Sequence, residues 1–155
     1  MPEPQVPATT ARGAAAPIWL HATCVELSGE GVVLLGASGS GKSDLALRLI
    51  DLGARLVADD QLAVERRGDR LFGRPAETLA GLLEVRGFGI VKLPWCAVCP
   101  LGLAVELDPD GPLPRLPEAG SYELLGVRLP HLRLDPRAPS ACAKVRLALA
   151  AERVA

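Results

Sequence analysis

A single run of eight residues constrains this chain more than any other feature. Residues 36–43 read GASGSGKS, which matches the pattern G-x-x-x-x-G-K-[S/T] at every fixed position. The apolar run before it, residues 31–36 (GVVLLG), predicts a short strand buried on both faces. The amphipathic pattern after it, from Lys42 to Leu52, predicts a helix. A buried strand, a glycine loop and a helix in this order predict a P-loop that cradles phosphate groups.

The residue types of the loop suit this task. Its glycines allow backbone angles and close approaches that a Cβ would block, so that backbone N–H groups can surround an anion. Lys42 supplies a cation for the β- and γ-phosphates, and Ser43 offers a hydroxyl to Mg²⁺. We therefore expect nucleotide binding by the loop and the residue that follows it: Gly36, Ala37, Ser38, Gly39, Ser40, Gly41, Lys42, Ser43 and Asp44.

The segment after the loop predicts how it is held. Leu45, Leu49 and Leu52 recur at i, i+4 and i+7 and predict the buried face of the helix, which we expect to end at Gly53. Residues 55–60 (RLVADD) then predict a second strand. Because a helix joins the two strands, we expect the second strand to lie beside the P-loop strand and parallel to it.

Two acids, Asp59 and Asp60, end this second strand. Ligands of open α/β sheets collect at the carboxyl ends of strands, so both acids are candidates to face the phosphates. One carboxylate would hold Mg²⁺ and the other would take a proton from an attacking hydroxyl, or one of them only caps the strand. Since neighbouring side chains on a strand alternate, only one of the two is expected to aim fully at the nucleotide.

Three further residues are candidates for the site. Glu84 and Arg86 lie two apart in GLLEVRGFGI (residues 81–90), which reads as strand, so they would share one face. They suit a metal ligand and a transition-state cation, and a surface ion pair would explain them as well. His21 precedes the P-loop strand, and a lone histidine is more often structural than functional.

The remaining chain predicts one α/β domain. Residues 1–16, rich in Pro, Ala and Thr, predict a flexible tail, and residues 17–155 predict the folded P-loop domain. Within that domain, residues 61–72 predict a hairpin and residues 143–154 a closing helix. With 17 basic and 18 acidic residues, the charge gives no reason to expect nucleic acid or a membrane as partner. No signal-peptide pattern is present, which indicates a cytoplasmic protein.

The sequence contains four cysteines, and we expect reduced, structural thiols. Cys96 and Cys99 have the C-x-x-C spacing of redox motifs, but Pro94 and Pro100 bracket them and no helix start follows. A zinc site would need two more ligands, and Cys24 and Cys142 are remote in the sequence.

Taken together, these motifs resemble the catalytic domain of HPr kinase/phosphorylase, the bacterial enzyme that phosphorylates a serine of the phosphocarrier protein HPr. The resemblance rests on His21, on GASGSGKSD (36–44), on LVADD (56–60) and on EVRGFGI (84–90), with similar spacing. It extends over residues 18–150 and is nearest to the short form typical of alphaproteobacteria. It implies a mixed sheet related to that of phosphoenolpyruvate carboxykinase.

The resemblance also implies an activity and roles. The chain would be an ATP- and Mg²⁺-dependent protein-serine kinase acting on an HPr-like phosphocarrier protein of the phosphotransferase system. Asp60 would be the general base and His21 its partner, while Lys42 would hold the phosphates. Ser43 and Glu84, joined by Asp59 from the reasoning above, would bind Mg²⁺. Arg86 would belong to the transfer loop, and Arg115 would match a family arginine near the reacting phosphate.

Departures from the family pattern leave alternatives open. Asp44 replaces a glutamate, VKLPWCAVCPLG follows the signature, and DPRAPSACAK (135–144) replaces a segment that the family links to dephosphorylation. Reverse phosphorylase activity and a homo-oligomeric state therefore stay open. Two other functions are compatible with the same loop: a P-loop small-molecule kinase and a non-catalytic nucleotide-sensing module.

Overall fold

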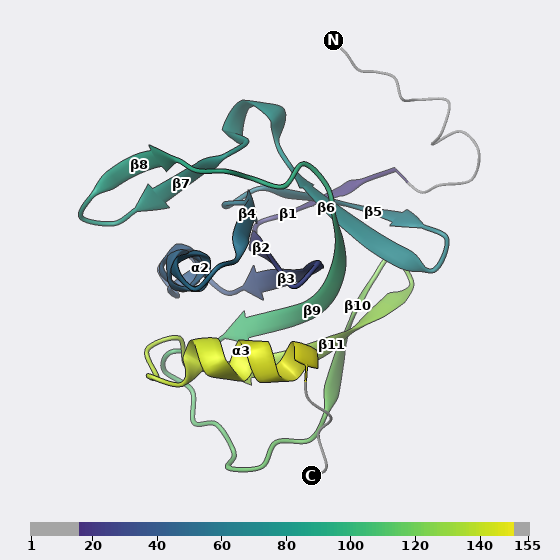
Figure 1. Ribbon diagram of the computed structural model, residues 1–155. Helices are drawn as coiled ribbons and strands as arrows, with labels where there is room; N and C mark the ends of the chain where they lie inside the picture. Colours follow the sequence, from purple (N-terminus) through teal and green to yellow (C-terminus); the bar gives the residue numbers. More distant parts are fainter. Residues whose placement is uncertain (1–15, 151–155) are drawn as a thin grey trace.

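The computed structural model of the chain describes residues 16–150 (Figure 1). Residues 1–15 of the predicted tail and residues 151–155, where the predicted closing helix ends, lie outside the described residues. The elements are β1 (Ile18–Leu20), β2 (Thr23–Leu27), β3 (Glu30–Leu35), α2 (Lys42–Asp51), β4 (Arg55–Ala58), β5 (Leu62–Arg67), β6 (Arg70–Pro75), the 3-10 helix η1 (Glu77–Leu79), β7 (Leu82–Val85), β8 (Gly89–Lys92), β9 (Cys99–Leu107), β10 (Gly120–Leu124), β11 (Val127–Leu134) and α3 (Ala141–Ala150).

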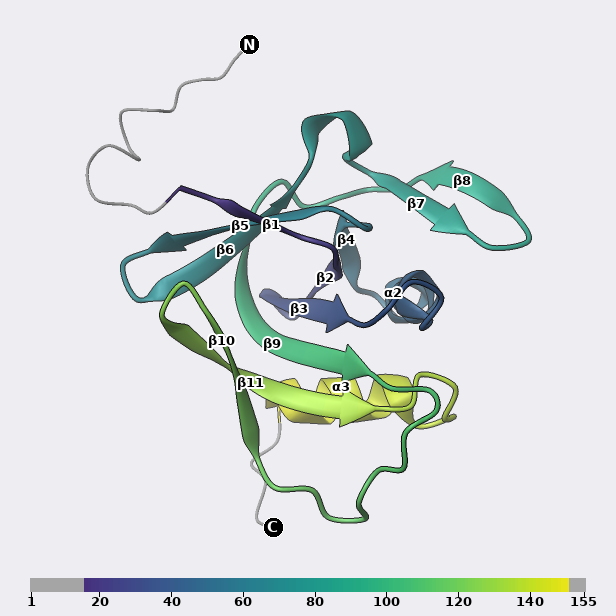
Figure 2. The same ribbon diagram turned by 180° about the vertical axis from the view of Figure 1, so that it is seen from behind.

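Nine of the strands form one mixed sheet, as the resemblance implies. The order β1-β5-β6-β9-β3-β2-β4 contains a single parallel pair, β9 with β3, and β11 adds a second parallel pair with β9. β9 is long and strongly curved, so its first residues pair with β6 and its last with β11 (Figure 2). β7 and β8 form a separate two-stranded ribbon that projects beside α2 (Figures 1 and 2).

The prediction that the strand after the helix lies directly beside the P-loop strand is wrong. β2 lies between β3 and β4 and is antiparallel to both. The tight turn at Ser28 and Gly29, where φ is +54° and +82°, returns the chain at once, so β2 and β3 pair as a hairpin and the helical crossover must pass over β2. Since β3 and β4 both oppose β2, they still point the same way and end at one edge of the sheet.

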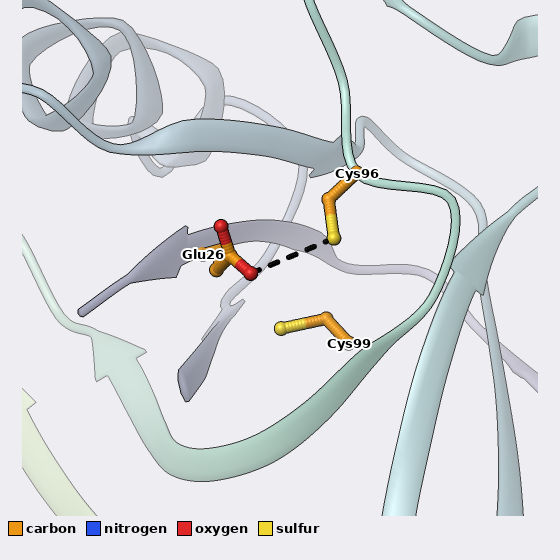
Figure 3. A group of neighbouring side chains, drawn as sticks. All are labelled: Glu26, Cys96 and Cys99. Carbon is orange, nitrogen blue, oxygen red and sulfur yellow. Dashed lines mark hydrogen bonds between the residues drawn. The ribbon is translucent and has the colours of Figure 1, made fainter. Parts of the chain in front are cut away.

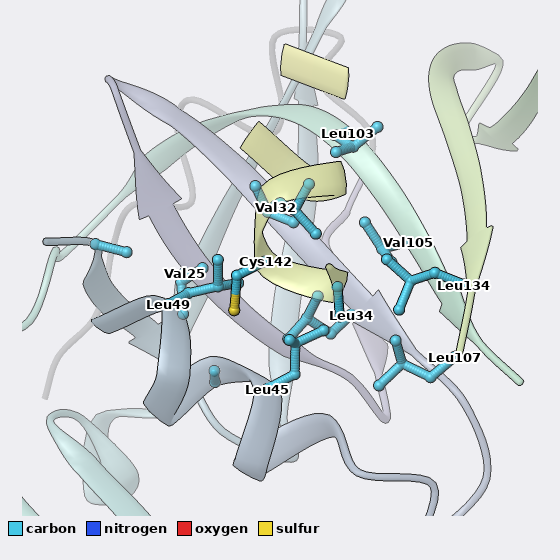
Figure 4. Packing of buried hydrophobic residues seen from close by; sticks show 14 residues of the cluster. Val25, Val32, Leu34, Leu45, Leu49, Leu103, Val105, Leu107, Leu134 and Cys142 are labelled. Atoms are coloured by element: carbon cyan, nitrogen blue, oxygen red, sulfur yellow. The ribbon is translucent and has the colours of Figure 1, made fainter. Parts of the chain in front are cut away.

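Two hydrophobic clusters cover the two faces of this sheet. Successive residues of β3 alternate between them: Val32 and Leu34 join the cluster under α2 and α3, whereas Val33 joins the cluster on the other face. Figure 4 shows the first cluster, in which Leu45 and Leu49 of α2 pack against the sheet. The prediction that the P-loop strand is buried on both faces is therefore confirmed.

The helix is confirmed, but its third predicted core residue is not. α2 ends at Asp51, and Leu52 is 57% exposed. The Gly53 N–H donates to the Ile50 carbonyl and the Ala54 N–H to the Leu49 carbonyl, which is the Schellman arrangement. Gly53, with φ +113°, thus ends the helix as expected, and the turn rotates Leu52 away from the core.

Of three further strand predictions, one changes in detail. The hairpin over residues 61–72 is confirmed as β5 and β6. Residues 18–27 (IWLHATCVEL) read as one strand in the sequence but divide into β1 and β2 at His21, whereas the strand-like run at residues 79–90, whose two glycines predict a tight loop, contains the turn between β7 and β8 as expected. Within residues 16–150, neither helix has the length and apolar character needed to cross a membrane.

Candidate functional site

A cavity of about 400 Å³ opens at the edge where β3 and β4 end. The P-loop, the start of α2, the acids after β4 and the end of β7 surround it. Its lining consists of His21, Thr23, Ser38, Gly39, Gly41, Lys42, Ser43, Asp44, Leu47, Asp59, Asp60, Glu84, Val85 and Arg86. Segments that are far apart in the sequence therefore meet at one site.

The backbone of the P-loop requires glycine at position 36. A Cβ on Gly36 would lie 2.4 Å from Ser40 Oγ, so a side chain there would break the turn. Gly41 is the N-cap of α2, and no side chain caps the helix. The first N–H groups of α2 are therefore available to an anion. Ser40 Oγ is buried without a partner among the described residues, a further polar atom within this loop.

Lys42 lies inside this loop rather than in solvent. Its side chain is almost buried, and Nζ donates to the carbonyl oxygens of Gly36 (2.7 Å) and Ala37 (3.0 Å). These bonds hold a cation at the mouth of the anion cradle. Three features fit the phosphates of a nucleotide: the uncapped start of α2, the glycine at a position without room for a Cβ, and this cation.

Asp59 connects three elements at the floor of the cavity. Its Oδ1 accepts hydrogen bonds from Ser43 Oγ (2.7 Å) and Thr23 Oγ1 (3.0 Å), and its Oδ2 accepts the Glu84 N–H (3.3 Å). The hydroxyl of Ser43 and the carboxylates of Asp59 and Glu84 thus line one space. Oxygen donors of this kind are what Mg²⁺ prefers, so the set fits a Mg²⁺ ion beside the phosphates.

Asp60 and His21 form a pair at the open side of the cavity. His21 Nδ1 lies 3.0 Å from Asp60 Oδ1, and His21 Nε2 lies 3.5 Å from Ser38 Oγ of the P-loop. Both side chains of the pair are 56% exposed, so an acceptor group from solution can reach the carboxylate.

The expectation that only one of the two acids faces the nucleotide is wrong. The strand ends at Ala58, and Asp60 adopts a left-handed backbone with φ +73°. Strand alternation therefore does not apply past Ala58, and both carboxylates line the cavity.

Glu84 and Arg86 also line the cavity, although they do not share a strand face. β7 ends at Val85, and Arg86 lies in the turn before β8. Among residues 16–150 no ion pair joins them. Arg115 lies elsewhere: it is exposed in the connection between β9 and β10 and does not belong to the lining.

The sequence analysis missed two contributions to the site. Thr23 is fully buried and positions Asp59; its signal is a hydroxyl residue at the start of a strand that continues with the apolar Cys24 and Val25. The segment before α3 lies against the P-loop helix, since Arg48 donates to the Pro136 carbonyl oxygen (2.5 Å) and Pro136 lies beside Gly41. This segment is part of the one in which the sequence departs from the family pattern.

The mixed sheet and the loop between β3 and α2 define a P-loop phosphate-binding domain of the α/β class. More particularly, the chain belongs to the family described as HPr Serine kinase C-terminal domain, whose sequence profile matches residues 13–95. It is 36% identical over 130 residues to the HPr kinase/phosphorylase of Geobacillus thermodenitrificans, a match that covers 76% of this chain and 42% of that protein.

Two further comparisons agree with this assignment. The chain is 46% identical over 74 residues to the HPr kinase/phosphorylase of Clostridium beijerinckii, covering 48% of this chain and 24% of that protein. The chain therefore spans less than half the length of these relatives. The structure of the HPr(Ser) kinase/phosphatase from Coxiella burnetii has the same fold, with a TM-score of 0.74 and 23% identity over 84% of this chain and 93% of that one.

Proposed function

We propose that this chain is an ATP- and Mg²⁺-dependent protein-serine kinase that acts on an HPr-like phosphocarrier in the cytoplasm. The observation that carries the proposal is the position of Asp60: its exposed carboxylate shares one cavity with Lys42 and the P-loop. A nucleotide-binding module without chemistry needs no such base, whereas transfer to a serine does.

The residues that line the cavity have separate roles in an in-line phosphoryl transfer. The serine hydroxyl of the acceptor gives its proton to Asp60 as its oxygen bonds to the γ-phosphorus, while the bond to the leaving oxygen of ADP breaks. His21, bonded to Asp60 at 3.0 Å, positions this carboxylate. Lys42 and Arg86 stabilise the charge that spreads over the phosphoryl oxygens. Arg115 has no role in this scheme because it lies outside the cavity.

Bound Mg²⁺ would supply charge neutralisation between the β- and γ-phosphates. Ser43, Asp59 and Glu84 are the residues that would hold it, and Thr23 would keep Asp59 in place through its hydroxyl.

The surface beside the cavity favours a protein as the acceptor. Phe88 and Ile90, in the turn and the second strand of the β7–β8 ribbon, are 80% and 70% exposed. Their neighbours Val85 and Arg86 line the cavity itself. Exposed large apolar side chains at the rim of a site are typical of surfaces that contact another protein, and a small metabolite would not need them.

The test uses the full chain, labelled ATP, Mg²⁺ and the HPr-like protein of the same organism. We expect one labelled serine on the carrier by mass spectrometry. Asp60→Asn should lower the transfer rate about 10²–10⁴-fold, the usual contribution of general acid–base catalysis, while ATP still binds. Asp69→Asn, in the exposed turn between β5 and β6, is the matched control and should leave the rate unchanged.

Three results would contradict the proposal. A wild-type rate in Asp60→Asn would show that this carboxylate is not the base. Turnover with small metabolites but not with the carrier would identify a small-molecule kinase. ATP binding without turnover on any acceptor would identify a nucleotide-sensing module. Incubating the phosphorylated carrier with inorganic phosphate tests the reverse phosphorylase reaction in the same assay.

A further inference from the structure

A second group of ligand-type side chains lies at the opposite end of β2 from the cavity. Cys96 and Cys99, in the connection from β8 into β9, face Glu26 near the end of β2 (Figure 3). The two sulfur atoms and a carboxylate oxygen all lie within 4.8 Å of one another. Nothing in the proposed phosphotransfer uses this group.

The expectation that no zinc site forms here rests on separation in the sequence, and the fold removes that separation. Cys24 was expected to be remote from the C-x-x-C pair, but it lies in the same buried cluster. Strand alternation explains this, because Cys24 and Glu26 are two apart on β2 and point to one face, while Val25 between them packs on the other. A carboxylate therefore meets two cysteines that are 70 and 73 positions further along the chain.

We propose that Cys96, Cys99 and Glu26 form a binding site for Zn²⁺ or a similar thiophilic divalent cation. The spacing suits tetrahedral coordination: bonds of about 2.3 Å to sulfur and about 2.1 Å to oxygen place the two ligand atoms about 3.6 Å apart. The Cys96 Sγ to Glu26 Oε2 distance is 3.7 Å. Because the Glu26 side chain is 21% exposed, water can reach the fourth position.

The charges around the site balance for a divalent ion. Two thiolates and one carboxylate carry three negative charges, a divalent cation returns two, and Arg55 returns the third. Arg55 Nε lies 3.1 Å from Glu26 Oε1, which leaves Oε2 directed at the sulfur atoms. A buried group that is neutral as a whole avoids the cost of an unpaired buried charge.

The thiols are poorly suited to redox chemistry. Cys99 is fully buried and Cys96 is 7% exposed. Both sulfur atoms are therefore poorly accessible to a redox partner from solution. Reactive cysteines have lowered pKa values and access to solvent, whereas a metal ion displaces the thiol protons when it binds.

A metal ion at this site would cross-link the connection before β9 to β2, to which few backbone contacts hold it. The Cys96 N–H donates to the Leu56 carbonyl of β4, and Glu26 belongs to β2. The ion would thus fix the connection before β9 onto β2 and, through Arg55, onto β4. Its expected effect is on stability rather than on the cavity.

The test measures metal content and the thermal unfolding midpoint of the tag-free full chain. We expect about one zinc per chain by mass spectrometry of the metal. Added zinc at a hundredfold excess over its dissociation constant should raise the midpoint of the metal-free protein by roughly 5–10 °C, and a chelator should reverse the rise. Cobalt in place of zinc should give thiolate charge-transfer absorption.

Variants make the outcome specific to this site. Cys96→Ser and Glu26→Gln should lose the zinc-dependent rise, and Glu26→Gln keeps the shape of the side chain, so it should still fold. Cys142→Ala, in α3 and outside this group, should keep the rise. A midpoint that ignores zinc, a rise that survives in Glu26→Gln, or a Cys96–Cys99 disulfide in the purified protein would overturn the proposal.

Discussion

β2 and β4 lie side by side, and their two ends differ in chemistry. At one end Thr23, Asp59 and Asp60 present oxygen atoms to a cavity that is open to solvent. At the other end Glu26 and Arg55 form an ion pair against two buried cysteines. Glu26 lies three positions after Thr23, which corresponds to roughly 10 Å along the strand.

One pair of strands can therefore serve two purposes. At the end beside the cavity, called the cavity end below, the carboxylates and hydroxyls are either exposed or hydrogen-bonded to one another. They can replace those hydrogen bonds with hydrogen bonds to a substrate. The sulfur atoms at the other end, called the sulfur end below, are buried. We therefore expect changes at the cavity end to alter transfer with little effect on stability, and changes at the sulfur end to do the reverse.

The largest expected effect comes from Leu49, which belongs to neither end but supports both. It is fully buried in α2 and shares a cluster with Val25 of β2 (Figure 4). Leu49→Ala should lower the free energy of unfolding by about 2–5 kcal/mol, since the truncation leaves a cavity under the sheet. Denaturant unfolding measures this loss.

Leu52→Ala is the matched control one turn further along. Leu52 is 57% exposed after the helix end, so its truncation should change stability by less than about 0.5 kcal/mol. Equal losses for the two leucines would mean that the helix packs differently from the structure described above.

Lys42→Met should produce the next largest effect, and only at the cavity end. Removing one preorganised charge from a transfer site lowers the rate about 10²–10³-fold. Zinc uptake at the Cys96–Cys99–Glu26 site should not change. Lys144→Met, exposed on α3, is the control. Steady-state transfer and metal content, measured on the same preparations, check both statements; a loss of zinc in Lys42→Met would show that the two ends are coupled.

The cavity end could largely be predicted from the sequence because its determinants are local. The P-loop, the helix start and the acids after β4 lie in contiguous motifs, so their residue types alone place them. Two local details escaped prediction. Leu52 fits the helical period, yet the turn at Gly53 takes precedence. The strand ends at Ala58 and Asp60 has a left-handed backbone, so strand alternation does not decide where the two acids point.

The sulfur end could not be predicted because it depends on contacts between distant segments. Its residues meet only because β2 inserts between β3 and β4 and because the chain after β8 pairs with β4 at Trp95 and Leu56. The turn at Ser28 and Gly29 pairs β2 with β3, and the sequence did not predict this strand order. Proximity in sequence was the only measure available, and by that measure Cys24 and Glu26 were far from Cys96.

The smallest effect comes from making the same change at two glycines, one in the P-loop and one just after α2. Gly39 in the P-loop and Gly53 after α2 have φ angles of +82° and +113°, and a Cβ on either would meet no atom within 4 Å. Alanine at each position should therefore cost a similar roughly 1–2 kcal/mol of backbone strain.

The two alanine variants should differ in ATP binding, because only one of the two glycines lines the cavity. Gly39 lines the cavity, where a Cβ would stand in the path of the phosphates, so Gly39→Ala should also weaken ATP binding. Gly53→Ala should bind ATP as the wild type does, and Gly53→Asn should recover part of the stability because asparagine tolerates this backbone. Calorimetry of ATP binding and denaturant unfolding separate the two effects. If Gly39→Ala binds ATP with unchanged affinity, the loop is not the phosphate cradle, and the contrast between the two ends loses its basis.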